Sequence, residues 1–319
     1  MPAMYATAPA KTILLGEHAV VYGMPAIAIP VNDLKSKAIL QALPLASPGT
    51  VLIKAPDIAL YSQLNQLPDN HPIAAAIHLV LDHYGLASSP ACLLTITSPI
   101  PIGSGLGSSA SVTVAILKAY SSFLGQPLPP DVVSDLAFKV EEIYHGSPSG
   151  IDNTVISHEK PIYYVKGHPA EFLSAPIKFS FLIGDTGISR KTADAVGMVR
   201  KAWEANPDDY NQIFHQIGEI VMAARAAMTQ GDRILLGQLL ITNQVHLSKM
   251  GLSAPKLDAL IEVSLQAGAL GAKLSGAGLG GNMIALVDEN TSSTVEQALR
   301  SAGAFSVFHA HIGCPEVRN

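Results

Sequence analysis

One glycine-rich stretch, SPIPIGSGLGSSASVTVAIL at residues 98–117, constrains the fold more than any other part of the chain. Gly103, Gly105 and Gly107 come directly before two serines and an apolar run. Glycine adopts backbone angles that other residues avoid, and it lets the main chain approach a ligand closely. Ser108 and Ser109 are good N-caps, so we expect a helix to begin there with its unpaired N–H groups directed at the loop. This arrangement favours a phosphate site, and a plain loop–helix junction is the alternative.

The glycine spacing excludes three common motifs. No lysine follows the glycines as a G-x-x-x-x-G-K-[ST] P-loop requires. The third glycine comes one residue too early for the G-x-G-x-x-G dinucleotide fingerprint. A separate glycine pair, Gly146 and Gly150, has the spacing of a G-x-S-x-G nucleophile elbow, but Pro148 occupies the position of its serine. The remaining pattern, P-x-G-x-G-L-G-S-S-A, resembles the phosphate-binding motif of the GHMP kinases, the family of galacto-, homoserine, mevalonate and phosphomevalonate kinases.

Composition narrows the class of protein. The chain of 319 residues is 48% apolar and 14% charged, which is typical of a globular protein with one large or two ordinary domains. A net charge of −5 without a Lys/Arg block argues against nucleic-acid and membrane partners. Cys92 and Cys314 form no metal or redox motif. Because neither a signal-peptide pattern nor a bilayer-length apolar run is present, we expect a cytoplasmic enzyme.

A cluster of charged residues interrupts apolar sequence near the N-terminus. We expect two short strands, at 13–15 and 19–21, with Lys11, Glu17 and His18 beside them. Buried charges are costly unless paired, so this cluster indicates either a site or ordinary surface and paired core residues. The sequence PAKTILLGEHAVVYG resembles the first GHMP motif in its mevalonate kinase form. The resemblance implies that Lys11 acts at the catalytic carboxylate and the transferred phosphate, and that Glu17 and His18 line the mevalonate pocket.

A second group of carboxylates follows residue 130. Asp131 is expected to cap a helix that ends near Glu141 and Glu142. The helix macrodipole disfavours negative charge at that end, so solvent exposure is the simple explanation for the glutamate pair. The loop HGSPSGID then places one carboxylate, Asp152, among apolar neighbours. This loop resembles the catalytic-aspartate loop of mevalonate kinases.

The same resemblance assigns roles by position. Asp152 matches the catalytic base and also contacts the substrate alcohol, and Lys11 matches its catalytic partner. Ser109 and Glu141 match the ligands of a Mg²⁺ ion that accompanies ATP. Ser149 falls beside the mevalonate pocket.

A third motif lies near the C-terminus, after a helical region that runs to about residue 250. The stretch KLSGAGLGG at 273–281 resembles the third GHMP motif, which implies a second glycine loop at the phosphates. Most relatives have glycine where Leu279 stands, so this residue raises a question about the loop conformation. Together the motifs imply a set of nucleotide-binding residues: Pro101, Gly103, Ser104, Gly105, Leu106, Gly107, Ser108, Ser109, Ala110, Gly276, Ala277 and Gly278.

Periodicity predicts the remaining elements. Strands are expected at 92–97, 161–164, 179–184, 283–287 and 305–312, and helices at 70–84, 255–267 and 291–301. With three motifs in family order, the resemblance implies an α+β GHMP kinase fold. Its N-terminal domain, residues 1–175, should be ribosomal S5 domain 2-like, and its C-terminal domain, residues 176–319, ferredoxin-like.

The implied reaction is ATP-dependent phosphorylation of the 5-hydroxyl of mevalonate, with Mg²⁺ as cofactor. Phosphomevalonate kinase or another small-alcohol kinase is the alternative within the family, and a non-catalytic ligand-binding regulator is the alternative from another class. Homodimers are common among such relatives.

Overall fold

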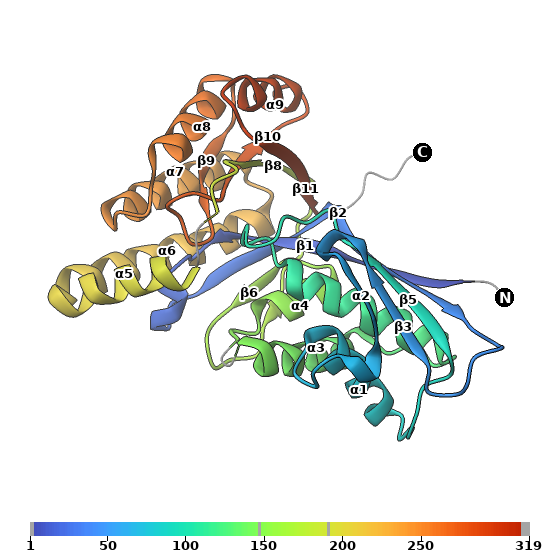
Figure 1. Ribbon diagram of the computed structural model, residues 1–319. Helices are drawn as coiled ribbons and strands as arrows, with labels where there is room; N and C mark the ends of the chain where they lie inside the picture. The colour runs from blue at the N-terminus through green and yellow to red at the C-terminus, as the bar shows by residue number, and fades with distance from the viewer. Residues whose placement is uncertain (1–2, 146–147, 190–191, 314–319) are drawn as a thin grey trace. The chain divides into compact units, whose positions relative to one another are not determined.

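The computed structural model describes residues 3–145, 148–189 and 192–313 (Figure 1). The described strands are β1 (Met4–Leu15), β2 (Ala26–Ala42), β3 (Val51–Ala55), β4 (Leu60–Gln63), β5 (Cys92–Thr97), β6 (Ile162–Tyr164), β7 (Glu171–Phe172), β8 (Phe179–Asp185), β9 (Gly271–Ser275), β10 (Asn282–Val287) and β11 (Ser306–Ile312). The described α-helices are α1 (Pro72–His83), α2 (Ser108–Phe123), α3 (Pro130–His145), α4 (Ile151–His158), α5 (Thr192–Ala205), α6 (Pro207–Gln230), α7 (Arg233–Lys249), α8 (Pro255–Gln266) and α9 (Ser292–Ser301). Among the described residues, no helix combines the length and hydropathy needed to cross a membrane.

The chain divides into two compact units, and each is built from separate stretches of sequence. The first unit contains the residues up to 10, then 34–102 and 107–159. The second contains 11–33, 103–106 and the chain from 160 onward. Strands β1 and β2 therefore contribute residues to both units. A single boundary after residue 175 stays a prediction about the two family domains.

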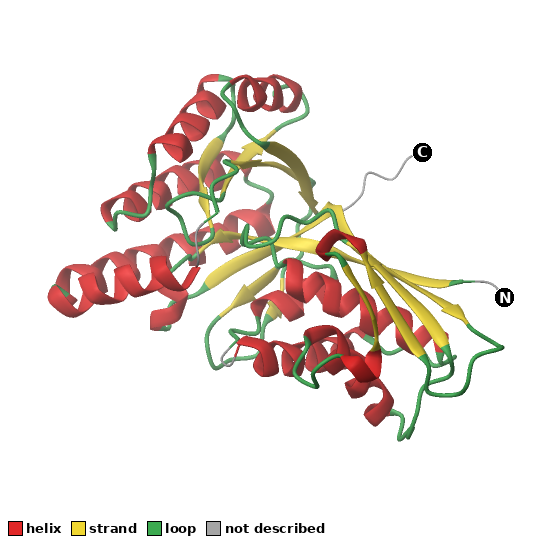
Figure 2. Cartoon of the chain, viewed as in Figure 1, coloured by secondary structure: helices red, strands yellow, loops and turns green. Residues whose placement is uncertain are grey.

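The first unit is a sheet with helices packed on one face (Figure 2). Its strands run in the order β4, β3, β5, β2, with β3 parallel to β5 and the other two pairs antiparallel. In β5, Cys92, Leu94 and Ile96 are buried while their neighbours are more exposed. This alternation is what a strand shows when one face of its sheet meets a core. Helices α1, α2 and α3 pack against one another over that core.

The second unit contains a four-stranded antiparallel sheet in the order β11, β8, β10, β9. Two strand–helix–strand segments interleave in this order, which is the ferredoxin-like arrangement, and the fold prediction is confirmed. All described residues of β9 and β10 are buried. Helix α8 packs on β9 and β10, α9 packs on β8 and β11, and α7 packs on β9 and on α6. The strands on either side of the second glycine loop are thus buried in the second unit.

The expected strands and helices outside the N-terminal motif are confirmed to within a few residues at each end. One expected strand is wrong, because Ala19–Tyr22 forms a 3₁₀ helix and the next strand begins at Ala26. Gly16 and His18 both have positive φ angles, of 96° and 59°, and they turn the chain out of the extended conformation.

Two capping predictions are also wrong. Gly107, in a left-handed conformation, is the N-cap of α2, so Ser108 and Ser109 belong to its first turn. The Ser108 hydroxyl donates to the Ile100 carbonyl at 3.3 Å instead of capping the helix. Helix α3 begins at Pro130, a residue whose fixed φ suits the first helical position, and Asp131 follows inside the first turn.

Candidate functional site

The first glycine loop has the backbone geometry of an anion-binding turn. Gly103, Gly105 and Gly107 have φ angles of 74°, 80° and 72°, a left-handed conformation at every second residue. Other L-residues adopt this conformation only with strain, which explains why the motif needs three glycines. Alternating backbone conformations of this kind gather successive N–H groups into a concave nest for anions.

Two carbonyl groups of this loop are held by other parts of the second unit. The Ser104 carbonyl accepts a hydrogen bond from Asn282 Nδ2 at 2.7 Å. The Leu106 carbonyl accepts one from the backbone N–H of Lys11 at 3.0 Å. The phosphate-binding motif is therefore tied both to the first motif, in β1, and to the start of β10, directly after the third motif.

The second glycine loop, residues 276–281, connects β9 to β10. A Cβ atom at Gly278 would lie 2.4 Å from the Leu252 carbonyl oxygen, so only glycine fits there. Leu279 has a φ of 62° and donates its N–H to the same carbonyl at 2.7 Å. It thus takes the conformation that a glycine would take. The Gly281 carbonyl accepts hydrogen bonds from both the backbone N–H and the hydroxyl of Thr186, each at 2.8 Å.

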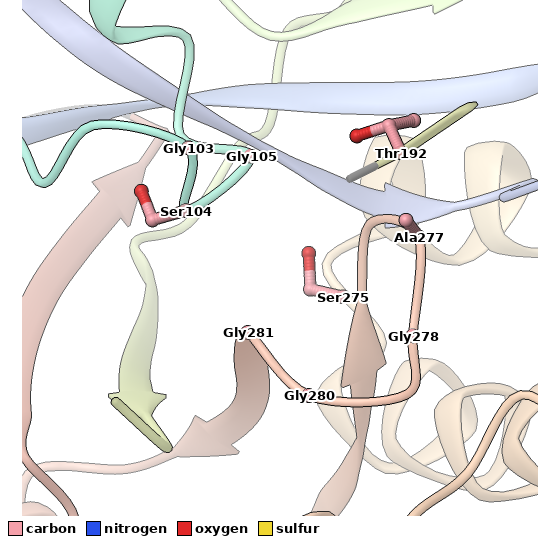
Figure 3. A pocket seen from close by; sticks show the side chains of 9 residues that line it. All are labelled: Gly103, Ser104, Gly105, Thr192, Ser275, Ala277, Gly278, Gly280 and Gly281. Atoms are coloured by element: carbon pink, nitrogen blue, oxygen red, sulfur yellow. The ribbon is translucent and has the colours of Figure 1, made fainter. Parts of the chain in front are cut away.

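Both glycine loops line one cavity of the second unit (Figure 3). Three residues with hydroxyl groups, Ser104, Thr192 and Ser275, are among those that line it. Thr192 and Ser275 are absent from the residues predicted from sequence. The residues that line the cavity are Gly103, Ser104, Gly105, Thr192, Ser275, Ala277, Gly278, Gly280 and Gly281. A small cavity lined by glycine backbone and hydroxyl groups suits a phosphate group.

Lys11 lies on β1, and its side chain is almost wholly buried. The next residue, Thr12, joins the first motif to the third. Ser275 Oγ donates to the Ile13 carbonyl at 2.7 Å. It therefore accepts the hydrogen bond that joins it to Thr12 Oγ1, also at 2.7 Å, because its single proton is already used. This hydroxyl pair fixes the backbone beside Lys11 against the end of β9.

Glu17 forms a fully buried ion pair with Lys273. Glu17 Oε1 meets Lys273 Nζ, and the side chains are 1% and 0% exposed. Glu17 Oε2 also lies 3.4 Å from Asn243 Nδ2. Burial lowers the pKa of Lys273, and the neighbouring Glu17 carboxylate opposes that shift. The described contacts of Glu17 are thus made to protein groups, and its predicted place in a substrate pocket stays a prediction.

His18 joins the first motif to the second glycine loop. Its Nε2 lies 2.9 Å from the Ala277 carbonyl oxygen. Because a carbonyl only accepts, Nε2 carries the proton, and Nδ1 of the neutral ring is left as an acceptor. Burial lowers the pKa of His18, against smaller opposing effects of the Ala277 carbonyl and Glu17. The left-handed φ of this buried histidine is the kind of strain that folds retain at functional sites.

The predicted catalytic carboxylates belong to the first unit. Asp152 lies half-buried in the first turn of α4, where the helix macrodipole favours a negative charge. Glu141, near the end of α3, is buried, whereas Glu142 is exposed. Solvent exposure therefore explains only the second glutamate of the pair. Ser109 lies in the first turn of α2, and α2, α3 and α4 pack against one another.

Ser149 lies just before α4 and is exposed, and its hydroxyl accepts a hydrogen bond from the Ile151 N–H at 3.4 Å. Residues 146 and 147 of this loop lie outside the described residues. The predicted site residues thus form two groups, one in each unit. The first unit contains Pro101, Gly107, Ser108, Ser109, Ala110, Glu141, Ser149 and Asp152, and the second contains Lys11, Glu17, His18, Gly103, Ser104, Gly105, Leu106, Gly276, Ala277 and Gly278.

The donor set suits a magnesium ion that is bound together with a phosphate ligand. In the part of the chain that the structure describes, no group of three or more His, Cys, Asp or Glu side chains could hold a metal. Mg²⁺ is usually bound by one or two carboxylates together with substrate phosphates and water. One buried carboxylate, Glu141, and one hydroxyl, Ser109, fit that requirement.

Two family models match the chain: GHMP kinases N terminal domain at residues 70–159, and GHMP kinases C terminal at residues 224–304. The mevalonate kinase of Thermococcus sibiricus is 37% identical over 95% of this chain and 94% of its own. Two solved structures are similar in fold. The L. major mevalonate kinase in complex with R-mevalonate has a TM-score of 0.82 at 28% identity, covering 97% of this chain and 95% of that one. The Methanococcus jannaschii mevalonate kinase has a TM-score of 0.85 at 27% identity, covering 98% of this chain and 99% of that one.

Proposed function

This chain belongs to the GHMP kinase family, and from that membership we propose that it is a mevalonate kinase. It transfers the γ-phosphoryl group of ATP to the 5-hydroxyl of (R)-mevalonate and gives 5-phosphomevalonate, a step of isoprenoid biosynthesis. The observation that carries the proposal is the similarity to mevalonate kinases along nearly the whole chain. The cavity lined by two glycine loops supports it, because a phosphoryl-transfer enzyme needs such a cradle.

Phosphoryl transfer requires positioning and charge neutralisation more than covalent chemistry. In the proposed mechanism, N–H groups of residues 103–107 and the N-terminus of α2 bind the triphosphate. The second glycine loop, residues 276–281 of the third motif, also contacts the phosphates in this mechanism. Ser109 and Glu141 would hold a Mg²⁺ ion, which would supply neutralisation of the phosphate charge.

The proposal assigns residues of both units to the reaction. Asp152 accepts the proton of the 5-hydroxyl as that oxygen attacks the γ-phosphorus. Lys11 offsets the negative charge that develops on the phosphoryl group. Ser149 and His18 serve the mevalonate side of the site. The neutral His18 ring, with Nε2–H bound to Ala277, offers Nδ1 as an acceptor for a substrate hydroxyl.

A coupled assay of ADP release tests the function. The purified chain is incubated with Mg-ATP and with mevalonate, phosphomevalonate, galactose or homoserine, and any product is examined by phosphorus NMR. We expect turnover with mevalonate alone and a phosphomonoester signal from its product. Turnover on phosphomevalonate or on another alcohol would replace the proposed substrate. ATP binding without turnover on any alcohol would identify a non-catalytic regulator.

A further inference from the structure

Asn282, which no motif singles out, links the two glycine loops. It is the first residue of β10, it pairs with Asp185 of β8 on one side and with Ser275 of β9 on the other, and it is buried. Its Nδ2 donates to the carbonyl of Ser104 in the first glycine loop at 2.7 Å. Its Oδ1 is buried and has no hydrogen-bond partner among the described residues. The described hydrogen bonding of this amide is therefore directed at the loop.

The hydrogen bond to the Ser104 carbonyl also sets the direction of the Gly105 N–H, because the two groups belong to one peptide. In a planar trans peptide, the C=O of one residue and the N–H of the next point in opposite directions. Holding the Ser104 carbonyl toward Asn282 therefore directs the Gly105 N–H away from Asn282. The hydrogen bond from the Lys11 N–H to the Leu106 carbonyl sets the direction of the Gly107 N–H in the same way.

The glycine that follows this peptide makes the anchor necessary. Rotation of the Ser104–Gly105 peptide changes ψ of Ser104 and φ of Gly105. Gly105 has a positive φ, yet glycine populates negative φ about as readily, so this peptide can rotate at little cost unless something holds it. The Leu106 carbonyl is held by a backbone N–H of β1, whereas the group that holds the Ser104 carbonyl is the side-chain amide of Asn282. Leaving the Oδ1 of that side chain buried without a partner costs stability, which suits a functional role.

We propose that Asn282 is a positioning residue of the nucleotide site, which fixes the Ser104–Gly105 peptide so that the Gly105 N–H is presented to a phosphate of ATP. This inference rests on the proposed function, and it adds a residue that acts through the loop without touching the nucleotide.

The test compares ATP binding, measured by titration calorimetry without mevalonate, with steady-state kinetics. We expect Asn282→Ala to raise the Kd and the KM for ATP about tenfold, the scale of one lost hydrogen bond at a binding group. The KM for mevalonate should change by less than about threefold, since the anchored peptide faces the nucleotide. An Asn282→Ala protein that binds ATP as tightly as the wild type would overturn the inference.

Asn282→Asp supplies a readout that a purely structural role would not move. An ionised carboxylate cannot donate to the Ser104 carbonyl, whereas a protonated one can. Burial beside a carbonyl raises the pKa of the introduced carboxyl. The ATP-binding defect relative to wild type should therefore shrink as the pH falls from about 8 to about 6, while the Asn282→Ala defect stays constant. An ATP-binding defect of Asn282→Asp that does not change with pH would overturn the inference. If Asn282→Ala does not fold, the pH dependence of Asn282→Asp still tests the inference.

Ser264→Ala is the matched control. Ser264, on α8 of the same unit, is fully buried and donates to the Leu260 carbonyl at 2.7 Å. This variant also loses a buried hydrogen bond, but it should leave the Kd for ATP unchanged. Because ATP binding is measured without mevalonate, a wild-type chain that binds ATP without phosphorylating mevalonate would overturn the proposed function and not this inference.

Discussion

Asp152 is the residue on which the proposed chemistry depends most directly. Asn in its place keeps the shape of the side chain but cannot take up the proton of the attacking alcohol. We expect Asp152→Asn to lower kcat by about 10²–10⁴-fold, with the ATP affinity retained. Asp131→Asn is the control, because Asp131 lies in the first turn of the neighbouring α3 and its side chain is 87% exposed. Near-normal turnover of Asp152→Asn would remove this residue as the base.

The buried pair of Glu17 and Lys273 predicts strong coupling between two substitutions. Removing one partner leaves the other buried without its counter-charge, so Glu17→Gln or Lys273→Met should each lower the free energy of unfolding by about 3–5 kcal/mol. The double variant replaces the charge pair by neutral groups of similar volume and should recover most of that loss. Urea unfolding of the four proteins measures the coupling. Additive losses would contradict the prediction.

His18 should make the protein less stable in acid. Burial lowers its folded-state pKa below the ordinary value of 6.5, so the unfolded chain binds the proton more tightly. Its contribution to stability is therefore complete above about pH 6.5 and declines as the pH falls from there toward the folded-state pKa. His71, His246 and His311, whose pKa values burial also lowers, act in the same direction.

His18→Gln keeps an N–H donor for the Ala277 carbonyl and does not titrate. Its free energy of unfolding should therefore depend less on pH than that of the wild type between about pH 5 and 6.5. Denaturant unfolding at a series of pH values measures the difference. Equal pH dependence in the two proteins would show that His18 does not contribute to the change of stability with pH.

Among the structural elements, the loop between β9 and β10 offers a matched pair of glycines. Gly276 and Gly278 have φ angles of 86° and 80°, so alanine is strained by about 1–2 kcal/mol at either position. Only at Gly278 does a Cβ meet a neighbour, the Leu252 carbonyl oxygen, while Gly276 has open space. Gly278→Ala should therefore lower the free energy of unfolding by about 1–3 kcal/mol more than Gly276→Ala does. Thermal unfolding measures the stability of both variants. An equal loss of stability in the two would contradict the predicted clash at Gly278.

The elements themselves follow from the sequence wherever the local pattern decides the structure. The strand Cys92–Thr97 is predicted to the residue because its alternation matches a half-buried sheet. The apolar residues 19–21 give the wrong prediction, because the turn before them depends on His18 and its contact with Ala277, 259 residues away. Thr192 is missing from the predicted site for the same reason, because only the folded chain brings it to a glycine loop. Ser275 and Asn282 stand in or directly after the third motif, but their contacts with Ile13 and Ser104 join residues far apart in the sequence.

At the scale of the whole molecule, the interleaved units predict that the chain cannot be divided at residue 175. A fragment of residues 176–319 lacks 11–33 and 103–106, which belong to the same compact unit. It would leave Lys273 buried without Glu17 and Ser275 without Thr12. We expect this fragment to show no cooperative thermal unfolding by circular dichroism, in contrast to the full chain. A cooperative transition would instead establish 176–319 as an independent domain.

The ion pair between Glu17 and Lys273 can form only late in synthesis on the ribosome. The two residues are separated by 256 positions. At about 5–20 residues per second, Glu17 waits roughly 13–50 seconds for its partner to emerge. During that interval β1 already has its paired strand β2, but Lys273 and the rest of β9 have not yet been made. The Glu17 carboxylate therefore lacks its counter-charge during most of the synthesis of the chain, and slower translation lengthens that period.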